Sequence, residues 1–473
     1  MMLFSTYEFT FFFMPFTVIV YFLLGKLSVR VQHVFLVSMS LYFYAYFKRD
    51  YLYIILSSIL VNYSIATIMQ KNRNYRRFWL ICGILFNVCL LGYFKYTDFL
   101  IENLNYLAGT NITLRHILLP LGISFFTFQQ FSFILGVFHG TDRVSSFADY
   151  CLFVTFFPQL IAGPIIIYCE MMPQFSDDIR RRLNCQNIVT GIYVFSIGLF
   201  KKLVLADTMA IFADNGFAMN ELGFVAAWAT SFSYTFQIYF DFSGYCDMAT
   251  GIASMFNIEL PANFNSPYKS RSITEFWRRW HMTLGRALAH YVYIPLGGNR
   301  KGAVRTYLNL IATFFVSGLW HGAAWNFVIW GVLHGCFSVM ERIFKKQLDR
   351  FPDSLRLVGT FLTVNFLWVL FRAESLSDAV KVYRGMTRFT TLGFAQLREV
   401  AFDGIVNLPS ILSIANVMVF TCACATIIFA GDNSIEKKAA FIPSARNALL
   451  TALTFLLAVI HMSKISPFIY FNF

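Results

Sequence analysis

The chain has 473 residues, of which 57% are hydrophobic, 19% aromatic and only 13% charged, whereas a soluble domain carries about 25% charged residues. This composition excludes an ordinary soluble globular protein and predicts that most of the chain lies in lipid. The net charge of +13 does not indicate nucleic-acid binding, because the basic residues lie in short loops between apolar runs and no basic stripe with stacking aromatic residues stands apart from them.

Apolar runs that approach the roughly 20 residues of a spanning helix recur along the whole chain, from Thr10–Leu24 to Ala448–Met462. The runs lack the alternation of a β-barrel, and backbone polar groups in hydrocarbon must be satisfied within helices. We therefore predict an all-α, polytopic membrane protein with one domain, divided into amino-terminal spans (1–145), a catalytic core (146–345) and carboxyl-terminal spans (346–473). The nine cysteines show no metal-ligand or redox spacing, so we interpret them as buried apolar residues and expect no metal site.

Basic loops suggest a topology. Basic residues follow each of the first three apolar runs. By the positive-inside rule, this pattern places the amino terminus outside the cytoplasm. The loops with Arg143 and with Arg180–Arg182 are then both cytoplasmic, so the apolar stretch Tyr150–Tyr168, which contains two prolines, is predicted to be re-entrant. The same argument predicts a break at Ser317–Gly322, between the basic residues around Arg305 and those around Lys345.

Two acidic residues, Asp241 and Asp247, interrupt the apolar segment YFDFSGYCD. We expect each to have a polar neighbour four residues away, Tyr245 for Asp241 and Ser243 for Asp247. One interpretation is structural, with buried carboxylates bonded to hydroxyls or basic groups. The other is an ion-coupled transporter that uses both acids. The preceding pair of Lys201 and Lys202 marks either the end of a span or a partner for these acids.

The segment Asn265–Arg300 is neither a clean span nor an ordinary loop. Ser272 and Glu275 match a capping box, which predicts a helix from there to about Leu288. Its aromatic residues recur at helical spacing beside several arginines, so it is either an amphipathic interfacial helix or a cationic floor for the phosphates of a thioester donor. For the second interpretation the candidate donor-binding residues are Trp277, Arg278, Arg279 and Trp280, with His281 as a catalytic candidate.

His321 lies in SGLWHGAAWN, in the middle of an otherwise apolar hairpin. An ionisable group at membrane depth usually faces a cavity, and burial favours the neutral imidazole, which can accept a proton from an attacking alcohol. The alternative is a buried structural histidine. We include the flanking Trp320 and Asn326 as candidate substrate contacts, together with Asp241 and Tyr245, and interpret His334 as structural. The chain has no GxSxG or HExxH motif, which disfavours a serine hydrolase and a zinc protease.

Several of these segments together resemble the bacterial branch of the membrane-bound O-acyltransferases, and most closely its alginate O-acetylation group. The matching segments are YFDFSGYCDMA, NFNSPYKSRSITEFWRRWHMTL, YIPLGGNRKG, LWHGAAWNFVIWGVLHG, YFKYTDF at Tyr93, PLGISFFTFQ at Pro120, LIAGP at Leu160, FKKLVLADTMA at Phe200 and FRAESL at Phe371. They are collinear over most of the chain.

The resemblance implies a ring of about 10 to 12 spanning helices with re-entrant segments around a central tunnel. His321 matches the invariant catalytic histidine of the family and His281 its second tunnel histidine. The expected reaction moves an acetyl group from a cytoplasmic thioester, acyl-CoA or an acyl carrier, to an extracytoplasmic acceptor in the bacterial inner membrane system. The expected partners are membrane lipid, an esterase-like acceptor protein and an exported polysaccharide, with no bound cofactor.

Two departures concern specificity. Relatives commonly read Trp-Leu-Arg-Asp where this chain has Ala287–His290, and many carry an arginine after LIAGP where this chain continues with Ile165. Both histidines are retained, so the reaction type is better supported than the acyl group or acceptor. D-alanyl transfer to teichoic acid, by a relative with the same core, therefore stays an alternative beside the transporter and a non-catalytic scaffold for polysaccharide export.

Overall fold

The computed structural model describes residues 2–389, 392–401, 410–463 and 466–469. These residues form helices, turns and loops without a β-strand, which confirms the all-α prediction. Six helices are long and apolar enough to cross a membrane: Glu8–Gly25, Tyr51–Lys71, Arg76–Ala108, Cys185–Ala218, Asp353–Arg372 and Leu412–Phe429. Two shorter apolar helices are Ile123–His139 and Ala445–Ile460. Any further members of the predicted ring of about 10 to 12 must be shorter or more polar than a simple span.

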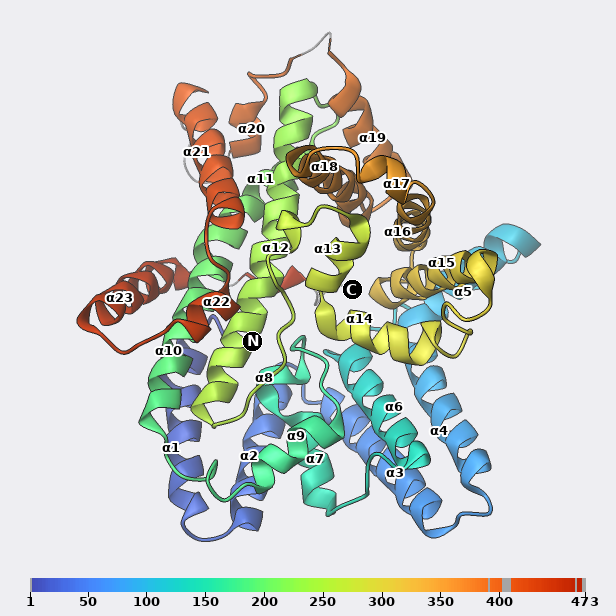
Figure 1. Cartoon of the computed structure of the whole chain (residues 1–473), viewed down its shortest axis with the longest axis vertical. Helices are drawn as coiled ribbons and strands as arrows, with labels where there is room; N and C mark the ends of the chain where they lie inside the picture. Colours follow the sequence, from blue (N-terminus) through green and yellow to red (C-terminus); the bar gives the residue numbers. More distant parts are fainter. Residues whose placement is uncertain (1, 390–391, 402–409, 464–465, 470–473) are drawn as a thin grey trace.

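Most of the amino-terminal part forms a bundle at one end of the molecule, whereas α5 lies away from that end, beside α15 (Gly302–His321; Figure 1). Its elements are η1 (Glu8–Phe13), α1 (Met14–Gly25), α2 (Val29–Ala45), α3 (Tyr51–Lys71), α4 (Arg76–Leu91), η2 (Gly92–Tyr96), α5 (Thr97–Ala108), α6 (Ile123–His139), α7 (Phe147–Thr155), α8 (Phe157–Leu160) and α9 (Tyr168–Ser176). Here η denotes a π-helical or 3-10 turn. The segment that we predicted to be re-entrant is indeed broken, into α7, α8 and an irregular stretch before α9, and it is buried from Tyr150 to Ile166. The surrounding protein therefore shields the backbone polar groups of this broken stretch from lipid, as broken backbone at membrane depth requires.

The central part contains α10 (Cys185–Phe200), η3 (Lys201–Ala206), α11 (Asp207–Ala218), α12 (Phe224–Met255), η4 (Pro267–Lys269), α13 (Ile273–Arg279), α14 (Met282–Leu288), η5 (Ala289–Tyr293), α15 (Gly302–His321) and α16 (Trp325–Ile343). The rest forms α17 (Lys345–Leu348), α18 (Asp353–Arg372), α19 (Leu376–Thr387), α20 (Leu397–Ala401), α21 (Ser410–Phe429), α22 (Ser434–Ala439), α23 (Ala445–Ile460) and η6 (His461–Ser463). Figure 1 shows α13 and α14 in the middle of the molecule, between the amino-terminal bundle and the helices α16 to α21.

Helices α10 and α12 pack along each other with their backbones nearly in contact. A Cβ atom at Gly198 would lie 2.6 Å from the carbonyl oxygen of Gly244, so only glycine fits at this crossing. The close approach brings the lysines that follow α10 against the acids of α12. The π-helical turn η3 carries these lysines and continues the helix into α11, so they do not mark the end of a span.

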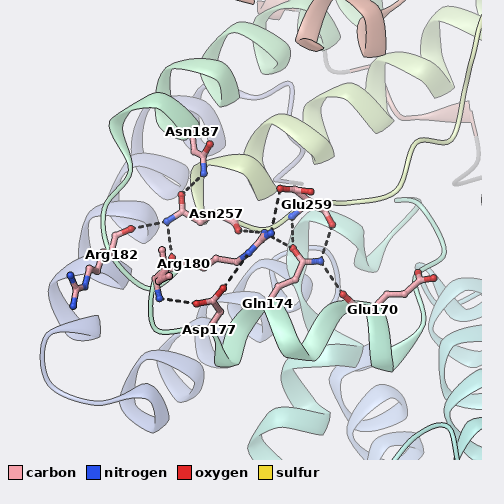
Figure 2. A network of polar contacts seen from close by, with 9 residues as sticks. Glu170, Gln174, Asp177, Arg180, Arg182, Asn187, Asn257 and Glu259 are labelled. Carbon is pink, nitrogen blue, oxygen red and sulfur yellow. Dashed lines mark hydrogen bonds and ion pairs between the residues drawn. The ribbon is translucent and has the colours of Figure 1, made fainter.

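The loop that follows α12 is fixed by the polar network of Figure 2. Asn257 ends α12 in the left-handed region, at φ 62°, and its amide donates to the carbonyls of Arg180 and Arg182 at 2.7 and 2.8 Å. Arg180 donates to the carbonyl of Asn257 at 3.0 Å and lies 3.4 Å from a carboxylate oxygen of Glu259. The network ties the chain that leads to the central segment Asn263–His281 to the basic loop before α10.

Helices α15 and α16 form the predicted hairpin, but the predicted break at Ser317–Gly322 is misplaced: α15 continues through His321, and the break lies at Gly322–Ala324. A Cβ atom at Gly318 would lie 2.3 Å from the carbonyl oxygen of Phe327 and 3.3 Å from the Cα atom of Gly331. The Gly318→Ala variant is therefore expected to lose about 1–3 kcal/mol of unfolding free energy through overpacking, measured by denaturation in mixed micelles. Gly359→Ala in α18, where a Cβ atom meets nothing within 4 Å, is the control and is expected to be neutral or stabilising. Equal stabilities of the two variants would contradict the close packing.

Candidate active site

His321 is the last residue of α15 and is 2% exposed. Its Nδ1 atom lies 2.7 Å from the carbonyl oxygen of Ser317. A carbonyl only accepts hydrogen bonds, so Nδ1 carries the proton and Nε2 keeps the basic lone pair of the neutral ring. The rings of Trp320, Trp330 and Phe371 surround the imidazole at centroid distances of 5.0, 5.1 and 5.4 Å. This tautomer is the one that a general base needs, with the lone pair on Nε2.

The end of α15 is held by two residues that the sequence analysis did not select. The ammonium group of Lys95 donates to the carbonyl oxygens of Trp320 at 2.5 Å and His321 at 3.2 Å, and the Tyr96 hydroxyl donates to the carbonyl of Leu319 at 2.6 Å. A cation at a helix carboxyl terminus satisfies the last carbonyls and is attracted by the helix dipole. The sequence feature that could have identified Lys95 is its place as a lysine within the apolar span Arg76–Ala108.

His281 lies between α13 and α14 with φ 44° and is 1% exposed. The prediction of one helix from Ser272 to Leu288 is therefore wrong, although Ser272 does cap α13 by accepting from the amide of Glu275. The carboxylate of Glu275 bonds the amide of Arg271, so the capping box is only half formed.

The helix breaks because Asn263 takes over its hydrogen bonds. The Asn263 carbonyl accepts from the amide of Met282 at 3.0 Å, and its side-chain oxygen accepts from His281 Nδ1 at 3.1 Å and from the amide and hydroxyl of Thr283. This buried asparagine, 3% exposed, therefore orients His281. The sequence analysis missed it, because its only signal was a place within the NFNSPYK segment.

The structure brings His281, Trp320 and His321 together. The indole of Trp320 lies between the two imidazoles, with centroid distances of 6.0 Å to His281 and 5.0 Å to His321. His334 lies behind this group, where its Nδ1 atom accepts from the indole of Trp277 at 3.1 Å. That bond agrees with a packing role for His334.

Two cavities lie beside α13, the helix that ends before His281. The inner cavity has a volume of about 610 Å³, and its lining includes Trp277, Met282, Thr283, Phe314 and Ser317. The outer cavity has a volume of about 840 Å³ and lies among α13, α16, α17 and α18. Thr274, Arg278 and Arg342 line both, so they form the boundary between the cavities. Neither imidazole lines them. Ser317 and Met282, which adjoin the histidines in structure or sequence, are the points of closest approach.

The predicted donor-binding residues separate into different places. Arg278 is exposed at the boundary of the two cavities, and no acidic side chain of the described residues pairs with it. Arg279 instead bonds Glu275 at 2.8 Å. Trp280 is fully buried against Phe264 and Trp368, away from both cavities.

Asn326 has a structural contact. Its amide donates to the carbonyl of Ala373 at 2.6 Å and so fastens the start of α16 to the end of α18. That contact holds the hairpin on which His321 lies.

Arg342 was not predicted as a cavity-lining residue, because its basic cluster was interpreted only as a loop.

Both acids of α12 form ion pairs with the lysines of η3. Asp241 lies 2.6 Å from Lys202, and Asp247 lies 2.7 Å from Lys201 and accepts from the hydroxyl of Ser434 at 2.6 Å. The expected neighbours four residues away are not the partners in the described structure. The Tyr245 ring packs on Phe4 and Phe468 instead. This arrangement favours the structural interpretation of the acids. Phe242, which follows Asp241 on α12, packs on the His281 ring at a centroid distance of 4.8 Å.

The chain is similar to known membrane-bound acyltransferases. The model of the family described as MBOAT, membrane-bound O-acyltransferase family, matches residues 116–377. A peptidoglycan O-acetyltransferase of Helicobacter pylori is 42% identical over 100% of this chain and 98% of its own length. A probable alginate O-acetylase AlgI of Pseudomonas aeruginosa is 39% identical over 85% of this chain and 78% of its own. A teichoic acid D-alanyltransferase of Bacillus subtilis is 27% identical over 54% and 69%.

Proposed function

This chain belongs to the membrane-bound O-acyltransferase family and is an O-acyltransferase of the membrane, and we propose that it moves an acetyl group from a cytoplasmic thioester through the protein to a hydroxyl of a cell-surface glycan. The observation that carries the proposal is His321, whose proton is fixed on Nδ1 by the Ser317 carbonyl. In the reaction, the acceptor oxygen attacks the thioester carbonyl while His321 Nε2 takes its proton. The carbon–sulfur bond then breaks, and the proton passes to the leaving sulfur.

The two cavities support a donor with a charged head and a slender arm. Basic side chains outnumber acidic ones in the lining of the outer cavity, with Arg271, Arg278, Arg342, Lys345 and Arg356 against Glu275, Glu341 and Asp349, and this excess suits phosphates. The lining of the inner cavity includes Arg278, Trp277, Phe314 and Ser317. An acyl-CoA or a phosphopantetheine thioester has this shape. The passage from there to His321 requires a shift of the side chains that enclose the imidazole.

The lining of the inner cavity supports acetyl over D-alanyl transfer. It contains three arginines, Arg278, Arg286 and Arg342, and no carboxylate among the described residues. An alanyl group carries an ammonium, which the arginines would repel, whereas an acetyl group is neutral. The relatives that match over more of their length are named for O-acetylation of peptidoglycan and alginate.

We infer that the acceptor is peptidoglycan, with alginate as the second candidate, because the peptidoglycan relative is 42% identical to this chain whereas the alginate relatives are 35–39% identical. An esterase-like partner outside the cytoplasm completes the transfer in this proposal, and the inner membrane is the site.

The proposal is tested with bacterial membranes that contain the full chain and labelled acetyl-CoA. Label is expected in the glycan and is released as acetate by mild alkali, whereas labelled D-alanyl donors give no product. Peptidoglycan and alginate fragments are compared as acceptors. Flux of a solute that persists without any thioester and depends on Asp241 and Asp247 would instead identify a transporter.

Arg278→Ala is expected to raise the KM for the thioester donor about ten-fold, which is the loss of one charge-assisted hydrogen bond. The kcat should stay unchanged, and the KM of the variant should depend less on salt. Arg279→Ala is the matched control, because Arg279 is paired with Glu275, and its KM should equal that of the wild type. If Arg279→Ala raised the KM more than Arg278→Ala, the result would contradict the assignment of Arg278 to the donor site.

A further inference from the structure

Ser317 accepts a hydrogen bond from His321 with its carbonyl and is one of the residues that line the inner cavity. The two residues are one helical turn apart, so their side chains lie on the same face of α15. Ser317 is 1% exposed and lines the inner cavity, and its Oγ atom has no hydrogen-bond partner within the described chain. A buried hydroxyl without a partner costs about 1–3 kcal/mol.

Other buried or cavity-facing hydroxyls nearby avoid this cost. On the same helix, Thr306 donates to the carbonyl of Gly302 and Thr313 to that of Asn309. Ser338 on α16 lines the same inner cavity, and its hydroxyl donates to the carbonyl of His334 at 2.8 Å. Ser317 has the same helical setting but forms no such bond. Its hydroxyl is therefore buried at the wall of the cavity without a partner, where the same shift of side chains that opens the passage to His321 would expose it to the donor.

We propose that the Ser317 hydroxyl binds the carbonyl oxygen of the thioester donor and stabilises the negative charge that develops there. The inference rests on the proposed function, in which the donor arm occupies the inner cavity and His321 is the base. When the acceptor oxygen forms its bond to the carbonyl carbon, the π electron pair moves onto the carbonyl oxygen, which accepts the Ser317 hydrogen bond. When the carbon–sulfur bond breaks, the pair returns and the thiolate takes the proton held by His321. Ser317 itself is not acylated.

The surroundings favour a carbonyl as the ligand of this hydroxyl. The indole nitrogens of Trp320 and Trp330, which pack on His321, are also buried without partners in the described chain, and both only donate. A group of donors around one base is suited to an acceptor oxygen that gains negative charge. Ser317 differs from the two indoles because it lines the inner cavity.

The test compares Ser317→Ala with Thr306→Val in the full chain, with labelled acetyl-CoA as the probe. Thr306 is a buried hydroxyl residue of the same helix that lines neither cavity. Ser317→Ala is expected to lower kcat ten- to hundred-fold, within the range for one oxyanion donor, with a KM within about two-fold of the wild type. The thermal midpoint of Ser317→Ala should be unchanged or higher, because the variant removes an unsatisfied group. Thr306→Val should keep the wild-type kcat, because the Thr306 hydroxyl only bonds the carbonyl of Gly302.

Each other outcome overturns the inference. A Ser317→Ala enzyme with wild-type kcat would do so, as would one in which only KM rises, since that result indicates ground-state binding. A fall in kcat accompanied by an equal loss in Thr306→Val would indicate general damage to α15. If Ser317→Ala is fully active while His321→Ala is inactive, this inference fails and the proposed function stands. If His321→Ala is active, the proposed function fails.

Discussion

Replacing His321 by alanine is expected to lower the rate of acetyl transfer by about 10³-fold, within the range for loss of a general base. The imidazole is 2% exposed, and the Ser317 carbonyl fixes its proton on Nδ1. Alanine has no group that can accept the acceptor's proton. The residual rate is measured as alkali-labile acetate on the glycan, with the amount of variant in the membrane determined on the same samples.

The matched control for this variant is His334→Gln. His334 is also fully buried, and its Nδ1 accepts from the Trp277 indole, a bond that the glutamine carbonyl can replace. Transfer by His334→Gln should stay within about ten-fold of the wild type, because His334 does not touch the reacting atoms. A non-catalytic scaffold predicts wild-type glycan acetylation in cells that carry either variant, and that result would remove the proposed base.

The amino-acid pattern predicted the helical class, the broken stretch before α9 and the hairpin that carries His321. These features follow from local sequence, because apolar run lengths, prolines and a single buried histidine are visible without tertiary contacts. The pattern also gave Lys201 and Lys202 as candidate partners of the acids, and the structure pairs them. This pairing was predictable because charged side chains within apolar runs are costly to bury unless they pair with an opposite charge.

The details of the site depended on partners far away in the chain. Ser272 starts α13 as predicted, but Asn263 ends the helical run at His281 by bonding Met282 and Thr283. Lys95 reaches the carbonyl of His321 from 226 residues away. The interpretation of the arginines was limited in the same way, because only the fold shows that Arg279 faces Glu275 whereas Arg278 faces the cavities.

Replacing Lys202 by methionine is expected to cost about 3–5 kcal/mol of unfolding free energy, the cost of leaving buried charge without its partner. The Lys202 ammonium lies 2.6 Å from Asp241 and 2.8 Å from Asp207, so the variant leaves two carboxylates facing each other. The side chain of Asp241 is only 2% exposed and cannot be solvated in place. The measurement is denaturation in mixed micelles, with helix content as the signal.

Two companion variants show whether charge is the cause. Lys201→Met should cost less, because Asp247 is 14% exposed and keeps its bond from Ser434. Adding Asp241→Asn to Lys202→Met should recover part of the loss, since the amide removes one of the two facing charges. The double variant should also retain acetyl transfer, because these residues neutralise one another and do not act on the acyl group. A double variant that folds normally but loses transfer would instead give the acids of α12 a direct role in the reaction.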